Sequence, residues 1–160
     1  MRKEFLKINW KVLILSLLVV FSIGFIGGLF TSESVDTDWY DSIKPDITPP
    51  GWVFPVAWNI IYLFIAFSFY FSWTSAKNKD IKRNLLILFG VNLFFNVLWS
   101  YLFFGLRLPG LAFVDLIFIW ITIIFMMVFT KKIDMKSFYL LVPYFLWVTF
   151  AGVLNGLIAF

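Results

Sequence analysis

The sequence predicts an all-α integral membrane protein, a bundle of five transmembrane helices that forms one domain over residues 1–160. Two observations support this prediction. Hydrophobic residues make up 62% of the chain and charged residues only 14%, whereas a soluble domain carries about 25% charged residues. Five apolar runs also each reach the about 20 residues that a spanning helix needs. Lipid must therefore be the solvent for much of the surface.

The five predicted spans lie at about 10–30, 51–74, 84–104, 110–130 and 137–160. The links between the last four spans are short, which predicts antiparallel neighbours, and only the link at 31–50 is long. Basic residues precede the first span, as they do in a signal peptide. Its apolar stretch exceeds the roughly 7–15 residues of a signal h-region, so we expect a retained helix.

Lysine and arginine predict the orientation. The other side of the membrane carries only Lys44 and Arg107, whereas eleven of the 13 basic residues lie on the side of the N-terminus: Arg2, Lys3, Lys7, Lys11, Lys77, Lys79, Lys82, Arg83, Lys131, Lys132 and Lys136. Loops rich in Lys and Arg stay in the cytoplasm. We therefore expect a cytoplasmic N-terminus and an outer C-terminus, in a bacterial or archaeal cell membrane.

The chain contains no Cys and no His. These absences exclude Cys nucleophiles, His general bases, zinc fingers and the usual haem ligands. We therefore expect no metal site and no resident cofactor. The net charge is +4, but its basic residues cluster between apolar runs, as membrane topology requires. Membrane lipid is an expected partner and nucleic acid is not.

Polar side chains inside the spans are informative because hydrocarbon offers them no partner. Asn92 and Asn96 lie four residues apart on one helix face, with Trp99 and Ser100 one turn further. Asp115 is the one carboxylate within a predicted span, and we expect it to face the bundle, protonated or hydrogen-bonded. Two interpretations stay open: polar contacts that join helices, or a ligand site.

Aromatic residues make up 22% of the chain. Trp58 has aromatic residues four positions before it and four after it, the latter being Tyr62. Trp147 follows Tyr144 by three residues, and Ala151 comes four residues later. Such stripes at helical spacing are typical of core packing, and they also suit the wall of a site for a flat aromatic ligand.

The order and spacing of several motifs are specific. They are Trp39-Tyr40, Lys44-Pro45, Thr48-Pro49-Pro50-Gly51-Trp52-x-Phe54-x-x-x-Trp58-x-x-x-Tyr62, Asn96-x-x-Trp99-Ser100-x-x-Phe103-Phe104, Ala112-x-x-Asp115 and Pro143-Tyr144-x-x-Trp147-x-x-Phe150-Ala151-x-x-Leu154-Asn155. Together they resemble the translocator protein family, also called the tryptophan-rich sensory proteins (TspO/MBR) or peripheral-type benzodiazepine receptors. One departure is Ile47, where the family often has an aromatic residue.

The resemblance implies a five-helix bundle, often a homodimer, with a pocket open toward the long loop. Family members bind porphyrins and benzodiazepine-type ligands, and are linked to sensing, scavenging or transport of tetrapyrroles. Carried over by motif position, the ligand-binding residues are Tyr40, Trp58, Tyr62, Asn92, Asn96, Trp99, Ser100, Asp115, Trp147 and Ala151. Because no Lys or Arg follows Lys136, the C-terminal sterol motif of animal members is missing.

A porphyrin, or another flat aromatic molecule, is therefore the expected ligand or substrate. Lys44 and Arg107 are the candidates for pairing with its carboxylates. Without His or Cys, the pocket suits a metal-free porphyrin better than haem. Two alternatives remain. One is an enzyme that degrades porphyrin with light and oxygen, in which Trp58 and Trp147 supply electrons. The other is a small-molecule carrier or a structural membrane partner.

Overall fold

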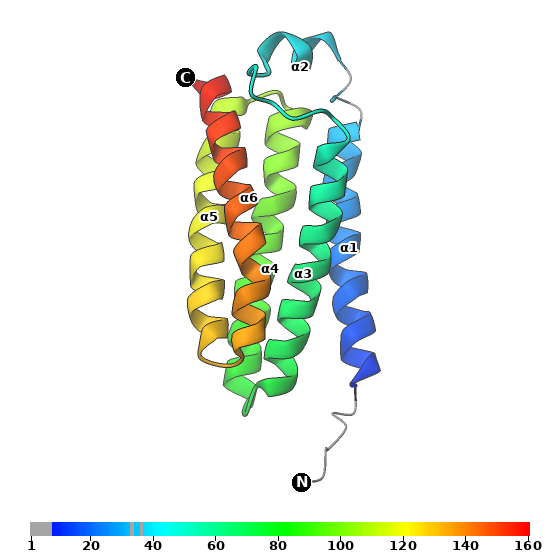
Figure 1. The fold of residues 1–160 in the computed structure, drawn as a ribbon, viewed down its shortest axis with the longest axis vertical. Coiled ribbons are helices and arrows are strands. Elements are labelled where there is room, and N and C mark those ends of the chain that lie inside the picture. The colour runs from blue at the N-terminus through cyan, green and yellow to red at the C-terminus, as the bar shows by residue number, and fades with distance from the viewer. Residues whose placement is uncertain (1–7, 33, 36) are drawn as a thin grey trace.

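The computed structural model describes residues 8–32, 34–35 and 37–160. Within them lie α1 (Trp10–Ser32), α2 (Asp38–Ile43), α3 (Val53–Ser75), α4 (Lys79–Ser100), α5 (Pro109–Lys131) and α6 (Met135–Ala159). A single π-helical turn, η1 (Tyr101–Gly105), extends α4. In this described part, five helices are long and apolar enough to cross a membrane (Figure 1). The predicted all-α, five-span membrane fold is confirmed.

Two spans begin earlier than the hydrophobic pattern predicts, because side chains cap them in the links. The predicted third span starts at 84, whereas α4 starts at Lys79. The Asn78 side chain accepts a hydrogen bond from the backbone N–H of Ile81, at 2.9 Å. Asp134 caps α6 in the same way, accepting from the backbone of Lys136 at 2.8 Å. Capping oxygens satisfy backbone donors that the first turn leaves free, so the helices extend into the polar links.

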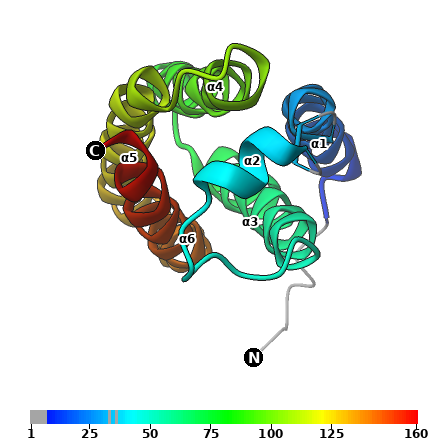
Figure 2. The ribbon, with the colours of Figure 1, turned by 90° about the horizontal axis from the view of Figure 1, so that it is seen from above.

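The long link between the first two spans contains the short helix α2, which the sequence analysis did not predict. Asp38 and Asp41 occupy its first turn, where carboxylates interact favourably with the helix N-terminus. Figure 2 shows α2 lying across one end of the bundle. We call this end the α2 end, and the opposite end, where the Lys-rich links lie, the basic end.

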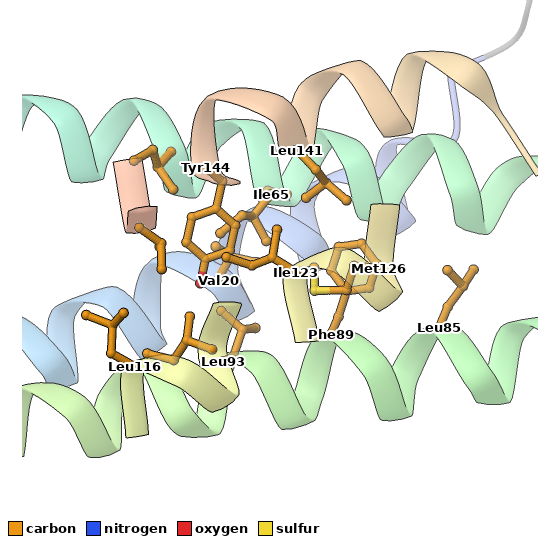
Figure 3. Packing of buried hydrophobic residues seen from close by; sticks show 14 residues of the cluster. Val20, Ile65, Leu85, Phe89, Leu93, Leu116, Ile123, Met126, Leu141 and Tyr144 are labelled. Carbon is orange, nitrogen blue, oxygen red and sulfur yellow. The ribbon is translucent and has the colours of Figure 1, made fainter. Parts of the chain in front are cut away.

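The five spanning helices form a ring (Figure 2). Helix α1 packs between α3 and α4, and α6 packs between α3 and α5, while α4 and α5 also pack together. The half near the basic end is filled by aliphatic and aromatic side chains (Figure 3). Ile65, Leu85, Ile123, Met126 and Leu141 are fully buried there. The α2 end is not filled in this way.

Candidate ligand-binding site

A cavity of about 880 Å³ lies in the α2 half of the bundle, between α1, α3, α4 and α6 and beneath α2. This volume falls in the range of about 300–1,000 Å³ that is typical of small-molecule sites. The lining residues come from every spanning helix and from α2: Phe21, Gly24, Phe25, Gly27, Gly28, Thr31, Ser32, Val35, Tyr40, Gly51, Trp52, Phe54, Pro55, Trp58, Asn59, Tyr62, Asn96, Trp99, Ser100, Phe104, Leu116, Ile119, Trp147, Val148 and Ala151.

Helix α3 supplies one aromatic wall, because four-residue spacing places its rings on one face. The Trp58 ring is stacked on Tyr62, with centroids 5.4 Å apart and planes 28° apart. The edge of Trp58 also meets Tyr144 of α6 at 6.3 Å. Above them, Phe54 meets Trp147 of α6 edge-on at 5.9 Å. The wall therefore presents broad π faces held by their neighbours.

A chain of hydrogen bonds runs from this wall across the bundle to α5. The Tyr62 hydroxyl donates to Asn96 Oδ1 at 3.0 Å, and Asn96 Nδ2 donates to the Tyr144 hydroxyl at 3.3 Å. The Tyr144 hydroxyl donates to Asn92 Oδ1 at 3.0 Å, and Asn92 Nδ2 donates to Thr122 Oγ1 at 2.9 Å. Thr122 completes the chain by donating to a backbone carbonyl of α5. Because the Tyr62 hydroxyl donates its own hydrogen to Asn96, its oxygen keeps acceptor capacity toward a ligand.

A second set of polar contacts orients Trp99 on α4. Its indole N–H donates to Asn155 Oδ1 of α6 at 3.0 Å, and Asn155 Nδ2 donates to the carbonyl of Pro109 at 2.9 Å. The Trp99 ring is stacked on Phe103 of η1, with centroids 5.1 Å apart. Asn155 is thus a structural link between helices, and it satisfies the indole donor inside the membrane.

Helix α2 covers the cavity through contacts with η1. Tyr40 lines the cavity and packs against Phe103 and Phe104, with centroids 6.4 and 5.7 Å apart. Burial raises the pKa of the Tyr40 phenol above its ordinary value, and the nearby Asp41 carboxylate adds to this. The phenol therefore stays protonated at neutral pH and remains a hydrogen-bond donor.

The structure places most of the predicted site residues around this cavity. Those that line it are Tyr40, Trp58, Tyr62, Asn96, Trp99, Ser100, Trp147 and Ala151. Asn92 lies behind the wall, where it bonds Tyr144. Asp115 is also outside the lining, although it is buried in the bundle as expected. Neither of its carboxylate oxygens has a hydrogen-bond partner among the described residues, so of the two expected states, protonated or hydrogen-bonded, the second is not found there.

The two predicted carboxylate-pairing cations lie outside the lining. The Lys44 ammonium pairs with the Asp41 carboxylate on α2. The Arg107 guanidinium lies over the Trp39 ring, 5.3 Å from its centroid. Arg107 thus contacts the cover from the segment after η1, whereas the exposed Lys44–Asp41 pair is local to α2 and its C-cap. No group of three or more Asp or Glu side chains arranged to hold a metal ion occurs in the described ranges.

The cavity wall formed by α1 was not predicted. Gly24, Gly27 and Gly28 line it together with Phe21 and Phe25. Apart from Ser22, this stretch of α1 is apolar, so its sequence is typical of an ordinary lipid-facing helix. The glycines were the available signal: they leave space, and small residues in a membrane helix indicate close approach of another group.

Five membrane-spanning helices around a covered, aromatic-lined cavity define a multi-pass membrane protein with an internal site of small-molecule size. The chain belongs to the TspO/MBR family, which matches residues 15–160. It is 40% identical over 148 residues to the tryptophan-rich protein TspO of Archaeoglobus fulgidus, covering 92% of this chain and 94% of that protein. It is 31% identical over 134 residues to the translocator protein of Bos taurus, covering 82% and 79%.

Proposed function

We propose that this protein binds a porphyrin or a related tetrapyrrole in the cavity beneath α2, with a sensory, scavenging or transport role. One observation supports this most directly. The cavity of about 880 Å³ is walled by the rings of Trp58, Tyr62, Trp99 and Trp147. Flat π ligands gain from stacking on such rings. The names of the relatives, tryptophan-rich sensory protein and translocator protein, agree with a sensory or transport role.

The polar groups of the wall suit such a ligand as well. Amide and hydroxyl groups of Asn96, Ser100 and Tyr62 line the cavity, and they orient polar atoms without bringing a net charge into the membrane. The Tyr62 oxygen, whose own hydrogen is donated to Asn96, is available to accept from a pyrrole N–H. A metal-free porphyrin therefore fits the chemistry of this wall.

The test is a titration of the purified protein with protoporphyrin in the dark, in which quenching of Trp fluorescence measures binding. Saturable binding is expected. Trp58→Phe and Trp147→Phe keep a π face and should keep most of the affinity, whereas Trp58→Ala should lose about 1–3 kcal/mol of binding free energy. Trp73→Phe is the matched control, because Trp73 lies at the other end of α3, stacked on Phe69. No saturable quenching would contradict the proposal.

A second candidate is the light-driven degradation of porphyrin, with dioxygen as the oxidant. The stacked pair Trp58–Tyr62, and the hydrogen bond that continues from Tyr62 to Asn96, favour it. Stacked indole and phenol rings are suitable electron donors to an excited ligand. Under light, loss of the porphyrin absorption spectrum should depend on Trp58 and Trp147. Stable absorption under light with intact binding would exclude this candidate, and absence of binding would leave a carrier or structural role.

We propose further that the N-terminus is cytoplasmic and that the α2 end faces outward. The uneven distribution of Lys and Arg supports this. Because the chain has no natural Cys, single cysteines report topology cleanly. On intact cells an impermeant thiol reagent should label Asp46→Cys and not Lys77→Cys. The reverse pattern would mean an inverted protein. The homodimer implied by the family resemblance is tested by mass measurement of the purified protein.

A further inference from the structure

We propose that the ligand reaches the cavity sideways from the bilayer, through an opening between α1 and α3 at the α2 end. This inference rests on the proposed ligand-binding function and adds the route. It predicts that a hydrophobic ligand dissolves in the outer half of the membrane first, and passes between the two helices without crossing water.

The contact between α1 and α3 is tight only up to mid-bundle. A Cβ atom at Gly24 would lie 2.4 Å from Tyr62 Cε2, so the two helices touch there. Toward the basic end, Val20 of α1 and Ile65 of α3 are buried in one hydrophobic cluster and close the contact. Gly24 and Tyr62 therefore mark the lower edge of any opening between these helices.

Beyond that edge the lining residues of both helices are exposed. Phe25 of α1 is 69% exposed and Trp52, just before α3, is 68% exposed, yet both line the cavity. Gly28, Pro55 and Asn59 are likewise exposed and also line the cavity. A Cβ atom at Gly28 would meet no heavy atom within 4 Å in the part of the chain that the structure describes. From Gly24 to the end of α1 the helix rises roughly 12 Å, at 1.5 Å per residue.

The rim of this opening is compatible with hydrocarbon. Asn59 Nδ2 donates to the carbonyl of Pro55 at 2.8 Å, and Thr31 Oγ1 donates to that of Gly27 at 3.3 Å. The Ser32 hydroxyl likewise donates to a carbonyl of its own helix at 3.2 Å. Among the described residues, none that lines the cavity is charged. A polar side chain in lipid must be satisfied internally, and these side chains are.

The route from water past α2 is obstructed by comparison. The Ser34 hydroxyl donates to the backbone carbonyl of Phe104 at 3.2 Å in a buried position. Trp39 packs edge-on against Phe103 at 5.9 Å, and the Arg107 guanidinium lies over the Trp39 ring. A ligand from the aqueous side would have to separate these contacts, whereas between α1 and α3 the position of Gly28 is not covered by any described residue.

The first test measures association kinetics of protoporphyrin with the full-length protein in lipid nanodiscs, in the dark, by stopped-flow Trp quenching. Gly28→Leu places a side chain in the opening without a clash. It should slow association about tenfold, as expected for a steric barrier of overpacking size. Gly90→Leu is the matched control: a Cβ atom at Gly90 on α4 also meets no heavy atom of the described residues within 4 Å, and Gly90 is outside the lining, so this variant should leave the association rate unchanged. Equal association rates for wild type and Gly28→Leu would overturn the lateral route.

A second test does not depend on porphyrin binding, so the lateral route and the proposed ligand-binding function can be tested independently. Ser100→Cys places a thiol in the cavity wall of α4, close to Gly27. A lipid-dissolved maleimide should label it faster than a charged, water-soluble maleimide, and Gly28→Leu should slow only the lipid-dissolved reagent. Faster labelling by the water-soluble reagent, unaffected by Gly28→Leu, would place the opening at α2. Loss of porphyrin binding with preserved lipid-side labelling would overturn the proposed function and leave the route standing.

Discussion

Two pairs of helices carry the same spacing of glycines and use it in opposite ways. In α6, a Cβ atom at Gly152 would lie 3.1 Å from Leu116 and one at Gly156 would lie 3.2 Å from Phe113, so α5 covers both positions. In α1, Gly24 is covered by Tyr62 of α3, whereas Gly28 faces open space. One pair of helices is packed along both glycines, and the other separates halfway.

This difference shows that glycines four residues apart do not by themselves determine close packing. Small residues permit helices to approach, but in lipid the approach is stabilised only where the partner supplies side chains that fill the space. Leu116 and Phe113 do this for α6. Beyond the Gly24–Tyr62 contact, Trp58 lines the cavity and is stacked on Tyr62, so it does not cover Gly28. The open half of the α1–α3 pair thus follows from how the aromatic wall is built.

The largest effect is expected for Gly24→Ala. The added methyl group would lie 2.4 Å from the Tyr62 ring, and that ring is held by Trp58 and by its hydrogen bond to Asn96. Overpacking costs about 1–3 kcal/mol, and we expect the upper part of this range in thermal or denaturant unfolding, together with weaker ligand binding. Gly28→Ala, one turn away, meets no such ring and should not lower the stability. Equal stability of Gly24→Ala and Gly28→Ala would show that α1 and α3 are not packed more tightly at Gly24 than at Gly28.

Tyr144→Phe should have the next largest effect, because it breaks the hydrogen-bond chain that joins Tyr62 of α3, through Asn96, to α6. The Tyr144 hydroxyl accepts from Asn96 and donates to Asn92, and it is fully buried. Its loss leaves an amide N–H and an amide oxygen unpaired. We expect a loss of about 2 kcal/mol in the free energy of unfolding, within the usual range for unsatisfied buried groups. Tyr62→Phe should cost less, because the Tyr62 hydroxyl makes one of these hydrogen bonds whereas that of Tyr144 makes two.

The sequence predicted the class of fold well, since length and composition leave few alternatives to five spans. It also placed Asn96, Ser100 and Trp99 on one face of α4 and the aromatic stripe on α3. It did not separate Asn92 from Asn96, because helical spacing gives the face and not the depth: one turn further from α2, Asn92 meets Tyr144 instead of the cavity. The α1 wall was missed because its main signal, the glycines at 24, 27 and 28, indicates close helix packing as readily as a cavity.

Replacing Asp115 with Leu should raise stability. Asp115 is 4% exposed, and neither carboxylate oxygen has a partner among the residues that the structure describes. A buried polar group without a partner costs free energy, so a leucine of similar size should contribute a gain of about 1 kcal/mol, with Asp115→Asn in between. Thermal unfolding of the three proteins measures this. A lower stability of Asp115→Leu would indicate that the carboxylate is bonded, through water or a ligand, in the membrane.

The smallest effect is expected for Gly152→Ala, in the packed pair. The new methyl group would lie 3.1 Å from Leu116 Cδ2, the end of a flexible side chain that can turn aside. The gain in helix propensity, about 1 kcal/mol, is common to every glycine-to-alanine change considered and cancels when the variants are compared. Relative to Gly28→Ala, the cost should therefore stay below about 1 kcal/mol. Gly156→Ala should cost more than Gly152→Ala, because it meets the rigid ring of Phe113 at 3.2 Å. If Gly152→Ala proved as damaging as Gly24→Ala, the packed pair would be the less tolerant one, and the contrast with α1 and α3 would be reversed.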